Sequence, residues 1–137
     1  MKALFHISLL MAAVLLLALP LAAAGPKPPQ ANGTPKYDLA TETTIKGTVQ
    51  EIKIFACKIG GPSGYHLELK TEKGVVEVHV AAGKYLTDYE FQFAVGDEVE
   101  VVGSTVQMDG KDAFLARTIK KGQSTYTFRD AKGNPLW

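Results

Sequence analysis

Cysteine is almost absent from this chain of 137 residues, which contains only Cys57. An intramolecular disulfide is therefore excluded, as are the Cys-x-x-Cys and Cys-x-x-Cys-His motifs of redox proteins, zinc sites and covalently attached haem. In an oxidising compartment a single thiol is buried and inert, paired with another molecule, or used as a metal ligand. The preferred interpretation of Cys57 is a small apolar residue at the end of a strand, and the alternatives are a reactive thiol and a ligand.

An excess of charge of either sign is also missing, since the formal net charge at neutral pH is +1. A nearly neutral surface exerts little electrostatic attraction on a phosphate backbone, which makes a nucleic-acid partner unlikely. The chain has no His-Glu-x-x-His motif and no Walker loop. Cys57 and His66 could form a nucleophile pair, but no oxyanion-hole motif or orienting third group accompanies them. We therefore predict that the protein is not an enzyme.

The one long apolar run lies at the N-terminus. Residues 1–24 combine Lys2, an apolar stretch, the break at Pro20 and three alanines before the predicted cleavage point. This layout is typical of a secretory signal peptide, and a retained N-terminal anchor is the alternative. We expect an exported protein, periplasmic or extracellular, whose mature chain has no membrane span. Cleavage would leave fourteen basic and fourteen acidic residues, and His66 and His79 as the only histidines.

The rest of the chain divides into three segments. Residues 25–36 are rich in proline and glycine and predict a flexible linker. Residues 37–121 have the length of one small domain. Residues 122–137 predict an extra strand and a turn that folds Leu136 and Trp137 back onto an apolar surface.

Alternating and periodic apolar residues predict an all-β core with one short helix. Glycine, proline and an Asp-Gly pair mark its turns. A change of parity near Gln50 predicts a bulge in the first strand, and Gly103 predicts another in the fourth. The expected elements are strand 43–55, loop 60–64, hairpin 65–80, helix 84–93, strand 98–108, turn 109–110 and strand 111–120.

This order of elements resembles the OB-fold, a five-stranded Greek-key barrel with a short helix between its third and fourth strands. The segment Gly-Asp-Glu-Val-Glu-Val-Val-Gly at residues 96–103 looks like the Gly-Asp run that many OB-folds carry at strand four. The chain is also similar to small exported bacterial OB-fold proteins whose role is not established. The resemblance implies a ligand surface on the outer face of strands two and three, and it does not specify the ligand.

The hairpin 65–80 has one apolar and one polar face. Leucines and valines alternate with polar residues, and the polar set includes both histidines of the mature chain. Function is therefore expected on this polar face. Its members are His66, Glu68, Lys70, Glu77 and His79.

Two registers keep the leucines and valines of the hairpin on one side. A four-residue loop places His66 opposite His79 and Glu68 opposite Glu77. A two-residue loop places Glu68 opposite His79 and Lys70 opposite Glu77, which makes an ordinary solvated face of paired charges. The first register sets two imidazoles where they could chelate a transition metal or flank a haem edge. The turn residues do not distinguish between the two registers.

The preferred hypothesis is a binding module that holds a small ligand, a metal or a partner protein. Its predicted ligand-binding residues are His66, His79, Glu68, Glu77 and Tyr85, with the two histidines as metal ligands. The alternative is an assembly subunit that docks into a complex of the cell envelope through its sheet edges and C-terminal tail. Nucleic-acid binding ranks third.

Overall fold

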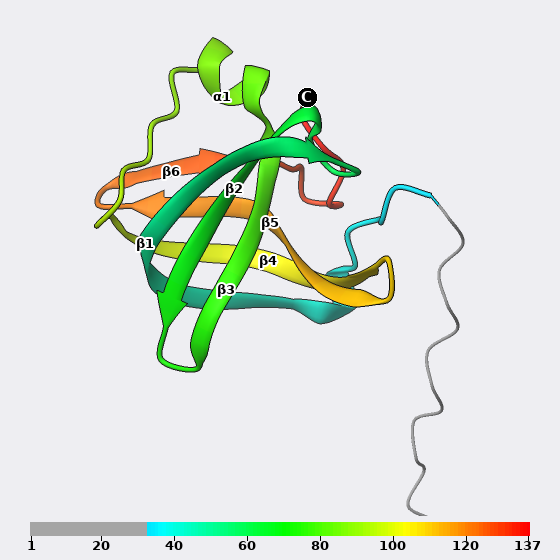
Figure 1. Ribbon diagram of the computed structural model, residues 1–137, viewed down its shortest axis with the longest axis horizontal. Coiled ribbons are helices and arrows are strands. Elements are labelled where there is room, and N and C mark those ends of the chain that lie inside the picture. Colours follow the sequence, from blue (N-terminus) through cyan, green and yellow to red (C-terminus); the bar gives the residue numbers. More distant parts are fainter. Residues whose placement is uncertain (1–32) are drawn as a thin grey trace, which may run out of the picture.

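The structure is a computed structural model that describes residues 33–137 (Figure 1). The predicted signal peptide, residues 1–24, and most of the predicted linker, residues 25–36, lie outside the described residues. Among residues 33–137, no helix is both long and apolar enough to cross a lipid bilayer.

The described chain is mainly β. Its elements are a 3-10 turn η1 (Leu39–Thr41), strands β1 (Glu42–Cys57), β2 (Gly61–Thr71) and β3 (Gly74–Ala82), helix α1 (Gly83–Asp88), and strands β4 (Glu98–Met108), β5 (Lys111–Lys121) and β6 (Ser124–Thr127). The predicted sequence of three strands, a short helix and two strands is confirmed.

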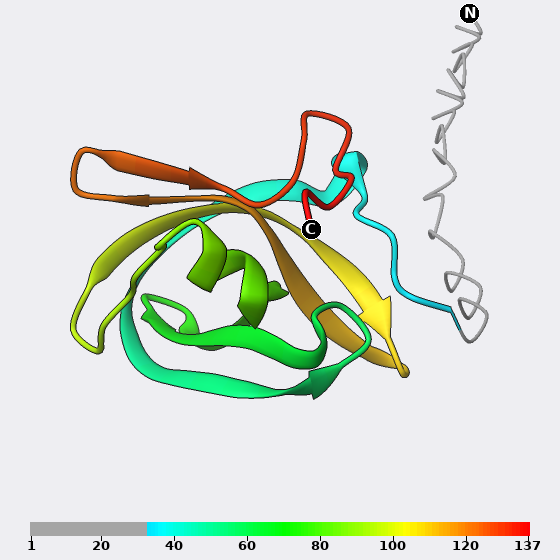
Figure 2. The same ribbon diagram turned by 90° about the horizontal axis from the view of Figure 1, so that it is seen from above.

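All six strands belong to one sheet in the order β3-β2-β1-β4-β5-β6, and each neighbouring pair is antiparallel. A parallel pairing of β3 with β5 joins the two sides, so the first five strands form a closed ring. Figure 2 shows α1 lying across one end of this ring, with β5 and β6 continuing beyond it as a two-stranded ribbon.

β1 is long enough to pair with β4 through its first half and with β2 through its second. The register with β2 shifts between Val49 and Glu51, which confirms the predicted bulge. A second shift, between Phe55 and Cys57, was not predicted. The predicted irregularity in β4 is confirmed by a register shift between Val102 and Gly103.

The main core fills the ring with side chains of alternate strand positions. The leucines of β2 and Val78 and Val80 of β3 are buried there, as predicted. A smaller apolar cluster consists of Ile59, Val106, Ala113 and Leu115, and Cys57 and Met108 pack against it.

Two predicted elements differ from the structure. The loop expected at residues 60–64 is wrong, because β2 begins at Gly61 and Gly64 pairs with Phe55 of β1. Glycine is suited to this position because a Cβ at Gly64 would lie 2.5 Å from the Cys57 sulfur. The helix is shorter than the predicted 84–93, since the chain leaves helical geometry after Asp88 and Glu90 has a positive φ of 55°.

The C-terminal segment folds back on the body of the protein. β6 pairs with β5, Phe128 is fully buried, and Trp137 packs against both apolar clusters. The guanidinium of Arg129 lies 4.9 Å from the Trp137 ring. Leu136, which was expected to pack beside Trp137, is instead 46% exposed.

Candidate metal centre

The hairpin of β2 and β3 adopts the register that brings the histidines together. His66 pairs with His79, and Glu68 pairs with Glu77. Two glutamates directly opposite each other repel unless a cation is near. That cation is Lys53 of β1, whose Nζ lies 2.6 Å from Oε2 of Glu68.

The two imidazoles are buried, whereas a ligand-accepting outer face had been expected to expose them. His66 is 0% exposed and His79 is 6% exposed. The Phe55 ring stacks on the His66 ring with a centroid separation of 4.0 Å, and the two histidine rings are 4.5 Å apart. The polar face therefore changes along the hairpin: Lys70 is exposed at one end, and the histidines are buried at the other.

One carboxylate faces both imidazoles. Oε1 of Glu77 lies 3.1 Å from Nδ1 of His66 and 3.7 Å from Nε2 of His79. The other ring nitrogens, Nε2 of His66 and Nδ1 of His79, are buried without a hydrogen-bond partner. A buried nitrogen without a partner costs about 1–3 kcal/mol. Histidines that bind metals commonly direct one nitrogen at a carboxylate and the other at the ion.

Cys57 completes a group of three potential ligands. Its sulfur and one nitrogen of each histidine all lie within 4.8 Å of one another. A Cβ at Gly64 would lie 2.5 Å from this sulfur and 3.0 Å from Nε2 of His66, so both atoms border the space left by the missing side chain. The backbone N–H of Gly60 donates a hydrogen bond of 3.1 Å to the sulfur.

Bond lengths decide whether these three atoms could share one ion. Zinc binds sulfur at about 2.3 Å and imidazole nitrogen at about 2.0 Å, which places the two donors about 3.5–3.8 Å apart. The observed upper limit of 4.8 Å requires a sulfur and a nitrogen donor to approach each other by about 1.3 Å at most.

Burial also sets the protonation state of the two histidines. Desolvation lowers the pKa of His66, although Glu77 opposes the shift. Desolvation, reinforced by the neighbouring His66, lowers the pKa of His79 to about 4. Both rings are therefore neutral at neutral pH, which is the form that binds metals.

The remaining predicted site residues play different parts. Glu77 supports the histidines, and Glu68 forms an ion pair with Lys53. Tyr85 is not part of this group: it packs in the main core and its hydroxyl donates to the backbone oxygen of Thr127. Cys57 had been considered as a reactive thiol or as a ligand, but it had not been grouped with the two histidines. The signal that could have found it is its position at the end of β1, two residues beyond Phe55 and close to a run of glycines.

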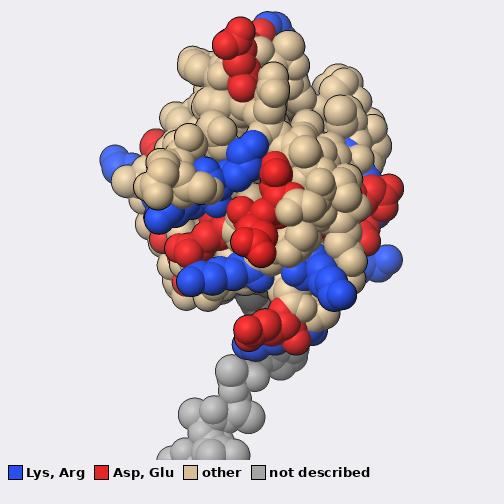
Figure 3. Space-filling view, turned by 90° about the vertical axis from the view of Figure 1, so that its left-hand side faces the viewer, with Lys and Arg blue, Asp and Glu red and all other residues tan. Residues whose placement is uncertain are grey.

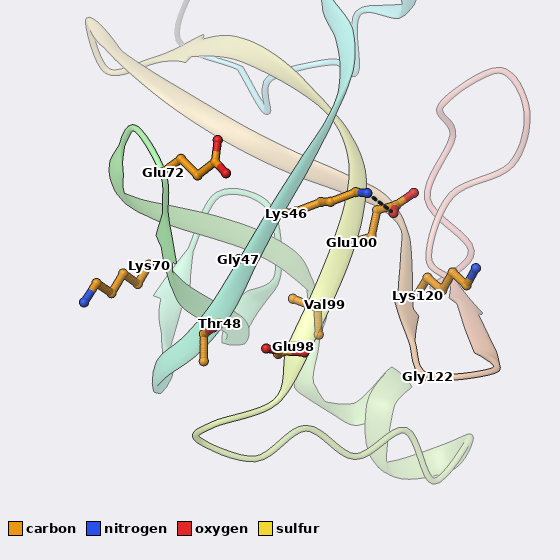
Figure 4. Close-up of a pocket in the computed structure, with 10 residues that line it drawn as sticks. All are labelled: Lys46, Gly47, Thr48, Lys70, Glu72, Glu98, Val99, Glu100, Lys120 and Gly122. Atoms are coloured by element: carbon orange, nitrogen blue, oxygen red, sulfur yellow. Dashed lines mark ion pairs between the residues drawn. The ribbon is translucent and has the colours of Figure 1, made fainter.

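A separate surface depression lies over β1, β2 and β4 (Figure 4). Lys46 forms an ion pair of 3.5 Å with Glu100 there, whereas Lys70 and Lys120 point away from that pair. No set of donors converges on one point in this region. Figure 3 likewise shows basic and acidic side chains interspersed on the face that it presents, with no patch of a single sign.

Comparison with known proteins identifies the family. No curated protein matches the chain significantly. The model of the MamS/MamX magnetosome protein family matches residues 41–126, a segment that contains Cys57, both histidines and Glu77. Because this match covers more than half of the chain, the protein belongs to the MamS/MamX magnetosome protein family.

Proposed function

We propose that the protein is an exported binding module with an OB-fold-like barrel that holds one transition-metal ion. Its ligands are the Cys57 sulfur, Nε2 of His66 and Nδ1 of His79. Two observations carry this proposal: one nitrogen of each imidazole lies within 4.8 Å of the only thiol of the chain, and each of the two buried rings has a nitrogen without a hydrogen-bond partner. In the absence of an ion these nitrogens destabilise the fold, and a bound metal would satisfy both.

The surroundings of the three donors support a metal more than a larger ligand. Glu77 fixes the orientation of the His66 ring, and the Gly60 N–H can stabilise a thiolate. The donors meet within 4.8 Å, which is the scale of a single ion. The Phe55 ring covers His66, so a flat macrocycle such as haem would have to displace it.

Two features support the proposed location. The family is described by its connection with the magnetosome. Residues 1–24 have the layout of a secretory signal. We place the protein outside the cytoplasm, in association with the magnetosome, where a metal-binding module would meet ions that are not held by cytosolic thiols.

The alternative of an assembly subunit has less support. Docking through the tail would need a free Trp137, yet this residue packs against both apolar clusters and against Arg129. A tail-deleted protein that loses its neighbours in co-purification, while retaining its fold, would favour that alternative.

Native mass spectrometry of the mature protein, purified from its own envelope, tests the proposal. The expected result is one transition-metal ion for each chain.

Titration of the metal-free protein with Co²⁺ should produce a thiolate-to-cobalt absorption band with one-to-one stoichiometry. Cys57→Ser and His79→Ala should abolish the band, and Lys70→Ala, an exposed change on β2, should retain it. Unchanged Co²⁺ binding in both ligand variants would refute the site.

A further inference from the structure

We infer that the ion is copper and that Met108 supplies a fourth, weaker ligand. This inference rests on the proposed metal-binding function and adds the identity of the metal. It depends on three observations: the chemical type of the donors, the surroundings of the sulfur, and the thioether in the adjoining cavity.

The donor set is soft. It combines one thiolate with two imidazoles, and no carboxylate belongs to the group that the described residues form. Two carboxylates that line the adjoining cavity already have partners: Glu77 faces the histidines, and Asp109 pairs with Lys58 at 2.5 Å. Thiolate and imidazole without hard oxygen ligands favour copper or zinc over magnesium, calcium or manganese. Among first-row divalent ions, copper binds a given site of this kind most tightly.

A thioether shares a cavity with two of the proposed ligands. Cys57 and His79 line a cavity of about 900 Å³, and Met108 lines the same cavity. Cys57 and Met108 also pack against the same small apolar cluster. The ion pair of Lys58 with Asp109 joins the residues that follow Cys57 and Met108, so the end of β1 is held beside the end of β4.

Two histidines, one cysteine and a distant methionine sulfur are characteristic of mononuclear copper sites. In such sites hydrogen bonds to the cysteine sulfur and an apolar surrounding tune the properties of the ion. Both features are present here, since the Gly60 N–H donates to the sulfur and Cys57 packs against the small apolar cluster. A structural zinc site would instead require four strong ligands, and a thioether is a poor fourth ligand for zinc.

Competition titrations test the choice of metal. The metal-free mature protein is titrated anaerobically with Cu⁺ against a chromophoric Cu⁺ chelator, and with Zn²⁺ and Fe²⁺ against chelators suited to those ions. The expected result is one Cu⁺ for each chain, bound at least about tenfold more tightly than Zn²⁺ or Fe²⁺. Addition of Cu²⁺ should give an intense visible thiolate-to-copper band.

Substitution of the methionine tests the fourth ligand. Met108→Leu conserves volume and should keep the fold. It should weaken Cu⁺ binding by about tenfold, because a weak fourth ligand contributes about as much as a hydrogen-bond partner of a metal ligand does. Zn²⁺ binding should be unchanged, since a thioether is a poor ligand for zinc. Thr105→Val, on the wall of the same cavity, is the matched control and should change neither affinity.

The outcomes separate this inference from the proposed function. Tighter binding of Zn²⁺ or Fe²⁺ than of Cu⁺ would overturn the copper assignment while the metal site itself stands. Equal Cu⁺ affinity of Met108→Leu and the unaltered protein would overturn the role of Met108. Failure to bind any of the three ions would overturn the inference together with the proposed function.

Discussion

The two faces of the β2–β3 hairpin are both buried near its histidines, but they are buried in different ways. On the inner face Leu67 and Val78 are fully covered by other apolar side chains. On the outer face His66 and His79 are covered almost as completely, and each retains a nitrogen without a partner. Burial of the apolar inner face stabilises the fold, whereas burial of the unpartnered nitrogens on the outer face destabilises it. A local feature that destabilises the fold in this way is typical of a functional site.

The largest expected effect is on the inner face. Leu67→Ala should lower the free energy of unfolding by about 2–5 kcal/mol, because it leaves a cavity at a fully buried position. Denaturant unfolding of the metal-free protein measures the change. Val75→Ala, on the exposed edge of the same hairpin, is the control and should have little effect. Equal losses in the two variants would show that the inner face does not carry the core.

The second expected effect concerns the space between the ligands. Gly64→Ala places a methyl group 2.5 Å from the Cys57 sulfur and 3.0 Å from Nε2 of His66. We expect a loss of about 1–3 kcal/mol in stability from overpacking. We also expect Co²⁺ affinity to fall, because the two donors are forced apart. Ser63→Ala, at the preceding exposed position, should alter neither quantity. Normal Co²⁺ affinity in Gly64→Ala would contradict the proposed ligand geometry.

The contrast between the faces also shows what could be predicted from the sequence. Alternation identified both faces of the hairpin and placed the leucines inside, because strand periodicity is a local property. The bulge after Val49 and the turn at Asp109 were likewise local signals. The register of β2 against β3 could not be predicted, since a two-residue loop and a four-residue loop both keep the leucines and valines on one face. The grouping of Cys57 with the two histidines was also not predicted. The position of Cys57 depends on a second bulge in β1 and on the close approach of Gly60 to Gly64, both set by tertiary packing.

A third effect should distinguish stability from function on the outer face. His79→Leu removes a nitrogen without a partner and supplies apolar surface at a position that is 6% exposed. The stability of the metal-free protein should therefore rise by about 1 kcal/mol or remain unchanged. The stabilisation by saturating metal, about 2.7 kcal/mol at a free concentration of 100 times Kd, should disappear. Thermal unfolding with and without Co²⁺ measures both. A strongly destabilised metal-free variant would mean that His79 is structural.

The smallest effect comes from a polar group whose partners are complete. Glu42 accepts two hydrogen bonds from Arg117 and one from the hydroxyl of Tyr37. These contacts hold the pKa of the Glu42 carboxyl below its usual value, with Arg117 as the largest cause. Its contribution to stability is therefore present above the pKa of the unfolded chain and is lost as the pH falls through the lower pKa of the folded protein.

Glu42→Gln isolates this contribution. At neutral pH the variant should be less stable than the unaltered protein, by an amount reduced by solvent screening because the Glu42 side chain is 24% exposed. The difference should shrink as the pH falls below about 4. Urea unfolding at a series of pH values measures it, and Glu98→Gln, an exposed change on β4, is the control. A difference that stays constant with pH would contradict the charge-assisted origin of the Glu42 contribution. The expected dependence would show that a partly buried polar group with a full set of partners adds stability in this fold. The histidines differ because one nitrogen of each ring has no partner.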